Sequence, residues 1–176
     1  MNISIEHFSK LIYFEGNSFV ETLVERYGNE FIPPLNTRNS STQQVFNNSS
    51  DSSNNEYFEK LLEQPALIIF IDSTPIGFMS YIKNYKLEFL KDFLESNYIT
   101  TIIINPEYRR LGAAKKLYQK LLTVEKGKFT TRTWSSNLSH INLLNQLGFN
   151  LIHEIANHRG EGIHTVYYGF DNDSHT

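Results

Sequence analysis

The sequence predicts a mixed α/β fold, in which a sheet packs against several helices, from two kinds of segment. Residues 66–71 and 98–104 form short runs rich in β-branched side chains, as in buried strands. Residues 113–122 instead repeat apolar side chains every three or four positions, as in a helix that buries one side. Because strand and helix patterns alternate along the chain, we expect them to share one domain.

The composition is that of a single folded domain. A length of 176 residues suits one domain, residues 1–176, and 13 phenylalanines and 10 tyrosines supply a core. Cysteine is missing, which excludes disulfides, thiolate metal sites and a cysteine nucleophile, and which fits a cytoplasmic protein. The formal charge of -3 gives no general attraction to nucleic acid or to an anionic membrane, so we expect neither as a partner.

The N-terminal third is predicted to be helical and then irregular. Residues 5–29 repeat apolar side chains at helical spacing, and Gly28 predicts the end of that helix. Residues 36–55 hold six asparagines and six serines, and they bury too little apolar surface to offset their ordering entropy. We therefore expect a flexible polar loop at about 36–55, which is either a tolerated insertion or a flap over a substrate site.

The rest of the chain is predicted to alternate between strands and helices. Residues 86–97 hold apolar side chains at helical spacing, which predicts a helix inserted before the strand at 98–104. Three histidines, His153, His158 and His164, have no carboxylate at metal-ligand spacing, so we expect no metal site. The other expected elements are a helix at 56–64, strands at 66–71, 76–82 and 128–134, a helix at 135–149, and a hairpin of residues 150–159 and 164–170.

The corner at residues 105–114, between a strand and a helix, is suited to an anion. The N–H groups at a helix start lack helical partners and lie at the positive end of the helix dipole. Residues 112–114 are a glycine and two alanines, so a phosphate could approach these groups closely. Arg109 and Arg110 add charge and fork-shaped donors. The alternative is an ordinary turn with solvated arginines, since the Walker and Gly-x-Gly-x-x-Gly patterns are both missing.

This corner resembles the diphosphate-binding motif of the GCN5-related N-acetyltransferase (GNAT) superfamily. That motif is Arg/Gln-x-x-Gly-x-Gly/Ala after a strand, and residues 109–114 read Arg-Arg-Leu-Gly-Ala-Ala. A second block is also similar, because Asn137 follows a strand and a short helix then ends in Leu-Gly-Phe at 147–149. The interval between the blocks suits the family. The resemblance implies a mixed, mostly antiparallel central sheet flanked by helices on both faces.

The resemblance also implies that the chain binds acetyl-CoA and moves its acetyl group to a primary amine. The strand at 98–104 would bond the pantetheine arm through its backbone, and the amides of the motif would hold the diphosphate. Asparagines of the second block would contact the rest of CoA. The cofactor-binding residues implied in this way are Ile102, Ile103, Ile104, Arg109, Arg110, Leu111, Gly112, Ala113, Ala114, Asn137 and Asn142.

The sequence departs from the family at two catalytic positions. The tyrosine that many members use as general acid is replaced by Leu144. The glutamate base of the branch that acetylates ribosomal proteins is replaced by Arg132, which argues against that branch. We assign the acid to Tyr168 on the last predicted strand and leave the base unassigned, since a water chain or a backbone carbonyl could serve. The alternatives for the acid are Tyr98, Tyr167 and His140.

Three functions are compatible with these features. The leading one is an N-acetyltransferase that moves acetyl from acetyl-CoA to a small-molecule or peptide amine by direct transfer. A catalytically inactive CoA-binding regulatory or interaction module is the alternative that Leu144 suggests. The third is a nucleotide- or phosphopeptide-binding domain, which would use the anion site at residues 105–114 but not the strand that would bind pantetheine. The acceptor is open among aminoglycosides, polyamines, amino acids, peptide N-termini and protein lysines, and the apolar C-terminal strands are compatible with a homodimer.

Overall fold

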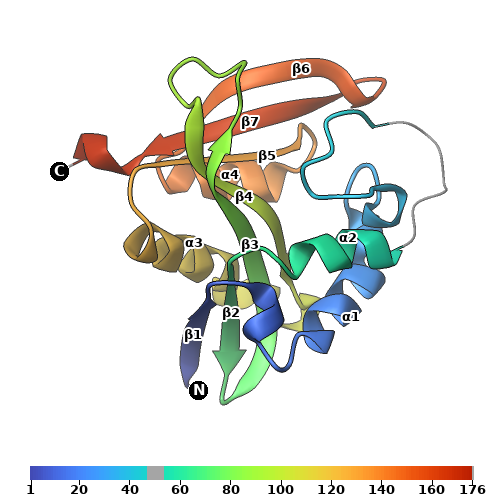
Figure 1. Ribbon diagram of the computed structural model, residues 1–176, viewed down its shortest axis with the longest axis vertical. Coiled ribbons are helices and arrows are strands. Elements are labelled where there is room, and N and C mark those ends of the chain that lie inside the picture. The colour runs from blue at the N-terminus through green and yellow to red at the C-terminus, as the bar shows by residue number, and fades with distance from the viewer. Residues whose placement is uncertain (47–53, 176) are drawn as a thin grey trace. The chain divides into compact units, whose positions relative to one another are not determined.

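The computed structural model describes residues 1–46 and 54–175, in which seven strands form one sheet (Figure 1). The strands are β1 (Ile3–Phe8), β2 (Ala66–Ile71), β3 (Thr74–Lys86), β4 (Glu95–Ile104), β5 (Lys128–Trp134), β6 (Asn150–Gly160) and β7 (Ile163–Asp171). Their order is β1-β2-β3-β4-β5-β7-β6, with β4 and β5 parallel and the pairs β1–β2, β2–β3, β5–β7 and β6–β7 antiparallel. This sheet and its helices confirm the predicted fold class.

Helices and short turns join the strands. The helices are α1 (Ser18–Tyr27), α2 (Asn54–Leu61), α3 (Ala113–Val124) and α4 (Leu138–Gln146), and the 3-10 turns are η1 (Leu11–Tyr13), η2 (Gly28–Glu30), η3 (Leu35–Thr37), η4 (Pro106–Leu111) and η5 (Asn172–His175). The chain divides into two compact units, and β3 and β4 contribute residues to both. The first unit is Met1–Tyr81 with Thr100–Leu121, and the second is Ile82–Ile99 with Leu122–Thr176. Within the described residues, each helix is too short or too polar to cross a membrane.

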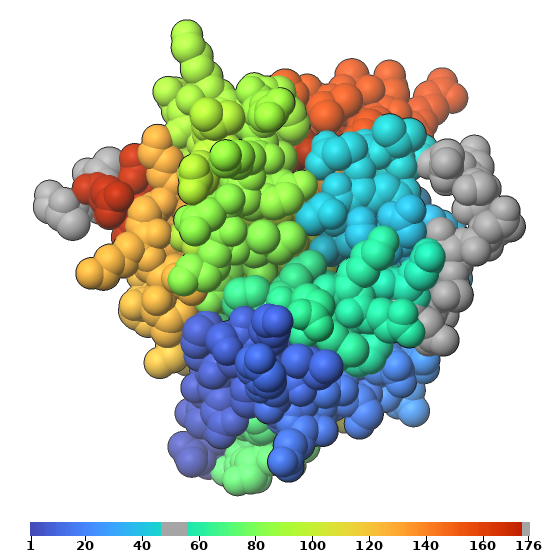
Figure 2. Space-filling model, viewed as in Figure 1, coloured from blue at the N-terminus to red at the C-terminus, as the bar shows by residue number. Residues whose placement is uncertain are grey.

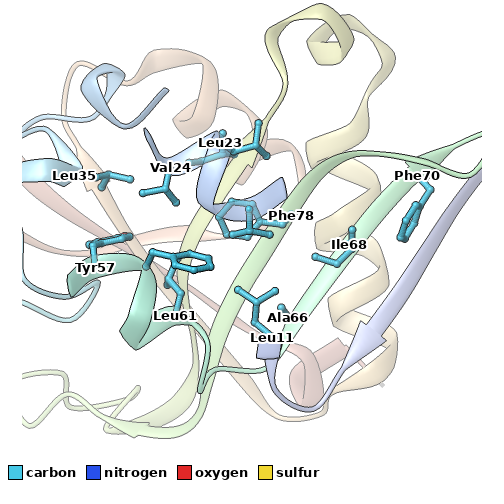
Figure 3. Packing of buried hydrophobic residues seen from close by; sticks show 13 residues of the cluster. Leu11, Leu23, Val24, Leu35, Tyr57, Leu61, Ala66, Ile68, Phe70 and Phe78 are labelled. Atoms are coloured by element: carbon cyan, nitrogen blue, oxygen red, sulfur yellow. The ribbon is translucent and has the colours of Figure 1, made fainter. Parts of the chain in front are cut away.

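The core of the first unit gathers α1, α2 and one face of the strands (Figure 3). Every second residue of β2, namely Ala66, Ile68 and Phe70, points into this cluster, as the period of a strand requires. Burial of these apolar side chains is the main force that holds the helices on the sheet. The other buried members are Leu11, Val20, Leu23, Val24, Leu35, Tyr57, Phe58, Leu61, Phe78 and Ile103.

Strand β2 is buried on its opposite face as well. Leu67 and Ile69, which alternate with the cluster residues, are fully inaccessible to solvent. The unbroken apolar run at 66–71 predicted this, since a strand with one solvated face would alternate with polar residues. The helix predicted at 113–122 is likewise confirmed as α3. Its buried residues are Ala113, Leu117, Tyr118 and Leu121.

The helix predicted at 5–29 is wrong over its first half. Residues Ile3–Phe8 form the edge strand β1, in which Phe8 lies opposite Ala66 of β2. Helix α1 begins only at Ser18. An edge strand is stabilised by main-chain bonds to its neighbour, which here is distant in the sequence, so the local apolar spacing did not reveal it.

The turn η1 is held against the end of α2 by main-chain hydrogen bonds. The N–H of Leu11 donates to the carbonyl of Gln64 at 2.7 Å, and the N–H of Ile12 donates to that of Leu62 at 2.9 Å. In Figure 2 the blue N-terminal segment and the blue-green segment of α2 adjoin on the surface of the first unit. The path between β1 and α1 is therefore fixed by contacts with α2 and not by a continuous helix.

The helix predicted at 86–97 is also wrong, because β3 and β4 extend into this segment from either side. Between the two strands, Leu87 and Leu90 are buried in an aromatic cluster of the second unit. The same cluster contains Tyr98 and Tyr167. Burial against partners that are distant in sequence has overridden the helical spacing of these leucines.

The remaining elements of the second unit agree with the prediction. The strand predicted at 128–134 is β5, the helix predicted at 135–149 is α4, and the C-terminal hairpin is β6 with β7. Aromatic pairs support these elements. Tyr85 stacks on Tyr98 with ring centroids 4.7 Å apart, and Phe149 stacks on Phe170 at 5.4 Å.

Part of the segment predicted as a flexible polar loop packs into the first unit. Arg38 and Ser41 are both buried. Arg38 donates from Nε and Nη2 to the carbonyl of Pro33 at 3.0 and 2.7 Å, and Ser41 Oγ accepts a bond from Gln64 Nε2 at 2.9 Å. These bonds satisfy the polar groups that the fold buries. Residues 47–53 of the predicted loop lie outside the described residues.

Leucine truncation should test the first-unit core. Leu61 is fully buried, so we expect Leu61→Ala to lower the free energy of unfolding by about 2–5 kcal/mol, through lost burial and a residual cavity. The same change at the exposed Leu138 should cost under about 0.5 kcal/mol. Denaturant unfolding of both variants is the measurement. Equal losses at the two positions would contradict the packing described for α2.

Candidate functional site

The predicted corner is a 3-10 turn that ends in a left-handed residue. The main chain leaves β4 where the N–H of Asn105 donates to the carbonyl of Ile76 at 2.8 Å. Asn105 then opens η4, because its side-chain oxygen accepts a bond from the N–H of Glu107 at 3.1 Å and Pro106 follows it. Gly112 ends the turn with a φ of +70°, and α3 starts at the next residue. Glycine adopts this conformation with less strain than other residues, which fits its place in the motif.

The start of α3 has the space and the polarity of an anion site. A β-carbon on Gly112 would meet no atom within 4 Å, so the position faces open space. The N–H of Lys116 donates to the carbonyl of Gly112 at 3.1 Å, which makes it the first bond of the helix. The N–H groups of residues 113–115 precede this bond at the positive end of the helix dipole. Exposed Arg110 and Lys115 add positive charge, so the site could bind a diphosphate.

The side chain of Arg109 is engaged elsewhere in the first unit. Its Nη1 and Nη2 donate to the two carboxylate oxygens of Glu30 at 2.8 and 3.0 Å. Its Nε donates to the carbonyl of Ile104 at 3.1 Å, and its guanidinium carbon lies 5.9 Å from the ring centroid of Tyr27. The hydrogen bond between them lowers the pKa of Glu30 and raises that of Arg109, so both groups are charged at neutral pH.

Two adjacent threonines, Thr100 and Thr101, bind other elements of the first unit just before the three isoleucines of β4. The Thr101 and Tyr57 hydroxyls bond at 2.6 Å, and the Thr100 and Ser80 hydroxyls bond at 2.7 Å. Tyr57 belongs to the first-unit cluster, and Ser80 lies two residues from Phe78 of that cluster. These side-chain bonds hold β4 against the first unit beyond Ile99, the last residue of β4 that pairs with β5.

The side chains of the three isoleucines are occupied by packing. Ile103 belongs to the first-unit cluster, Ile104 is buried, and Ile102 is half-buried. A β-carbon on Gly77 of β3 would come within 2.5 Å of Ile104 Cδ1, so glycine permits this close approach. The main chain is the part of this segment that remains for a ligand, in line with the backbone recognition that the resemblance implies.

The asparagines of the second block have different surroundings. Asn137 caps α4, and its Nδ2 donates to Thr133 Oγ1 of β5 at 3.0 Å, while the N–H of Ile141 donates to its carbonyl at 3.0 Å. Asn142 is exposed on α4. Asn137 thus fixes the turn from β5 into α4, and the side chain of Asn142 is accessible to a ligand.

Strand β7 places its two adjacent tyrosines on opposite sides. Tyr167 is buried in the aromatic cluster with Tyr98, whereas Tyr168 lies opposite Thr131 of β5 and is 7% exposed. Burial, and secondarily the charge of Glu154, raises the pKa of Tyr168 above its usual value. Burial also raises the pKa of Tyr98. Both hydroxyls therefore keep their protons at neutral pH.

The hairpin histidines bond to neighbouring polar groups. His158 Nδ1 and Thr165 Oγ1 are 2.7 Å apart, and His164 Nδ1 accepts a bond from the N–H of Asn157 at 2.9 Å. In the part of the chain that the structure describes, no group of three histidine, aspartate or glutamate side chains could hold a metal ion.

Residues 34–149 match the model of a known protein family, whose description is acetyltransferase (GNAT) family. The matched segment is more than half of the chain and contains both the corner and the second block. The chain belongs to the GNAT acetyltransferases. The resemblance drawn from the two sequence blocks is thereby confirmed. A search of curated proteins gave no match.

Solved structures share the fold of this GNAT acetyltransferase. A GNAT-family acetyltransferase from Streptococcus agalactiae 2603 aligns with a TM-score of 0.66 and 18% identity, over 96% of this chain and 95% of that chain. The protein smu.2055 from Streptococcus mutans UA159 aligns at 0.64 and 19%, over 98% and 99%. The protein yncA from Salmonella typhimurium, solved with its cofactor acetyl-CoA, aligns at 0.59 and 14%, over 99% and 96%. At these identities the likeness shows the fold alone.

Three positions of this acetyltransferase bear on its acid and base. Leu144 is fully buried in α4, so the position where many members carry a tyrosine belongs to the core. Arg132 lies opposite Tyr167 in the β5–β7 pair, where it offers a cation in place of a carboxylate base. Burial lowers the pKa of His140 from 6.5 to about 4. His140 is therefore neutral at physiological pH and is a poor general acid.

The titration of His140 should appear in the stability of the protein. With a pKa of about 4 in the fold and 6.5 as its ordinary value, the unfolded chain binds more protons between these pH values. The free energy of unfolding should therefore fall as the pH drops from 6.5 to 4, and His140→Gln should weaken this dependence. Unfolding curves at several pH values and NMR titration of the His140 ring test this. An NMR pKa near 6.5 would contradict the lowered pKa of the imidazole.

Proposed function

We propose that this GNAT acetyltransferase moves acetyl from acetyl-CoA to the primary amine of a small molecule or peptide. Membership of the family supports the acetyl transfer, and the open, positively charged start of α3 behind Gly112 carries the assignment of the donor. The whole chain, residues 1–176, acts as one domain in this proposal. The lack of cysteine fits a reaction in the cytoplasm.

The residues of the corner fit the phosphates of CoA. The diphosphate would bind the N–H groups around Gly112, where no β-carbon blocks the approach, and Arg110 and Lys115 would supply charge. The main chain of residues 102–104 would bond the pantetheine arm, since their side chains serve packing. Asn142 is exposed and would contact the rest of CoA, and we keep Asn137 as a further contact of the same kind.

The transfer itself needs a neutral amine, a stabilised oxyanion and an acid. The amine nitrogen attacks the thioester carbonyl, the C–S bond breaks, and the departing thiolate takes a proton. We propose Tyr168 as the donor of that proton, because its raised pKa keeps the hydroxyl protonated at neutral pH. A water chain or a backbone carbonyl would accept the proton that the amine releases.

A catalytically inactive CoA-binding module is the second candidate function. The observation that favours it is Leu144, which occupies the usual acid position with a fully buried apolar side chain. Such a module would bind acetyl-CoA and CoA, but it would release no free thiol with any amine. An assay of thiol release over a panel of amines separates the two functions.

Two glycines give a matched test of the CoA site. Gly112 and Gly162 have φ values of +70° and +75°, and a β-carbon on either would meet no atom within 4 Å. Valine at either position should cost about 1–3 kcal/mol of stability through backbone strain. Acetyl-CoA at about 100 times its dissociation constant should add roughly 2.7 kcal/mol to the wild type and to Gly162→Val, but little to Gly112→Val.

Thermal unfolding with acetyl-CoA, CoA and ADP is the measurement. A larger shift with acetyl-CoA and CoA than with ADP supports a site for the whole cofactor. An equal shift with ADP would favour a nucleotide site instead. If Gly112→Val and Gly162→Val keep the same shift with acetyl-CoA, the cofactor does not bind at the start of α3.

Two tyrosine variants test the acid. Tyr168→Phe removes the proposed proton donor, so kcat should fall by about 100-fold or more, which is the usual contribution of a general acid. Tyr167→Phe removes a hydroxyl from the opposite side of the same strand and should leave kcat within a few-fold of the wild type. Thiol release with an accepted amine gives both rates. Equal kcat values for Tyr168→Phe and the wild type would remove Tyr168 from the mechanism.

A further inference from the structure

The geometry of Arg109 points to a role other than phosphate binding. A guanidinium has five N–H donors in one plane, and both of its free edges recognise anions in pairs. Here one terminal pair faces the carboxylate of Glu30 and Nε faces the carbonyl of Ile104. Arg109 therefore joins the end of β4 to the turn η2, and the ring of Tyr27 lies against its flat face.

Apart from the hydrogen bonds of Asn105 at its start, the turn that carries Arg109 has few contacts to hold it. None of the residues of η4, Pro106–Leu111, is buried. A segment without buried apolar contacts opens at low free-energy cost. A two-point bond between charged, planar groups is stronger and more specific in direction than an ordinary surface ion pair. The pair with Glu30 is thus a main restraint on η4 and, through Gly112, on the start of α3.

We propose that the Arg109–Glu30 pair is a brace that holds η4 and the start of α3 in the form that binds diphosphate, and that Glu30 is a positioning residue for the cofactor. The proposal rests on the proposed function for its consequence in CoA binding. Direct charge at the phosphates would come from Arg110 and Lys115, which are exposed. Glu30 lies far from the motif in sequence and carries a negative charge. Its charge alone would weaken the binding of an anionic ligand, whereas the brace would strengthen it, so the two effects can be told apart.

The direction in which Glu30→Gln changes the affinity for CoA distinguishes the brace from an alternative in which Arg109 itself binds the phosphates. If Arg109 left Glu30 and turned to the phosphates on binding, Glu30→Gln would free the arginine and strengthen CoA binding. Removing a negative charge near an anion site would also strengthen binding by simple electrostatics. The brace instead predicts that Glu30→Gln weakens CoA binding, because a loosened η4 has to be ordered when the ligand binds.

Calorimetric titration with CoA tests the proposal in four variants of the full chain. Glu30→Gln and Arg109→Gln should each weaken CoA binding by about threefold to tenfold, and the double variant should be no weaker than the weaker single one, since all three break the same pair. Glu25→Gln makes the same charge change on an exposed residue of α1 and should leave the affinity unchanged. Equal or tighter binding by Glu30→Gln would overturn the brace.

Amide hydrogen exchange tests the brace without any ligand. In Glu30→Gln, the amides of residues 107–114 should exchange about threefold to tenfold faster, while those of β2 should keep their wild-type rates. Faster exchange in both places would show a general loss of stability and would overturn the proposal, as would unchanged exchange at 107–114. If the wild type bound no CoA, the proposed function would fail, and exchange would still decide whether Glu30 restrains η4.

Discussion

Hydrogen bonds from two adjacent threonine hydroxyls determine how β4 can present its main chain. Up to Ile99 the strand pairs with β5, and Thr131 donates to the carbonyl of Ile99 at 3.1 Å. Beyond Ile99, the Thr100 hydroxyl bonds Gln64 and the Thr101 hydroxyl bonds Tyr57, both of the first unit. Side-chain bonds therefore hold this part of the strand in position. The proposed contacts of residues 102–104 with the cofactor depend on this support.

The same part of the first unit is tied to the segment at residues 28–46 at two places. Near its start, Glu30 bonds Arg109 of η4, and further on Ser41 bonds Gln64, whose side-chain oxygen accepts a bond from Thr100 of β4. A displacement of this segment would therefore strain bonds to the strand and the turn that are proposed to hold CoA. The sequence left open whether residues 36–55 are a tolerated insertion or a flap, and Ser41 connects the described part of this segment, through Gln64 and Thr100, to the strand that is proposed to hold the cofactor.

The sequence predicted those elements whose cause is local. The apolar run of β2 and the apolar stripe of α3 each follow from a few neighbouring residues, and both predictions were correct. The failures share another cause. The edge strand β1 and the loop that carries Leu87 are decided by partners that are distant in sequence. The candidate site divides in the same way. The motif at residues 109–114 could be recognised from neighbouring residues, whereas the partner of Arg109 is a carboxylate 79 residues away.

The choice between the two tyrosines of β7 follows from how each could recover a proton. Tyr167 is fully buried, and its hydroxyl has no hydrogen-bond partner among the described residues, so a proton lost in one turnover has no path back. Tyr168 is also held neutral by burial but retains 7% exposure, which allows exchange with water. Leu144 removes the usual acid from α4, and His140 is neutral at physiological pH and therefore a poor acid. We therefore propose Tyr168 of the sheet as the acid, because it combines a retained proton with access to solvent.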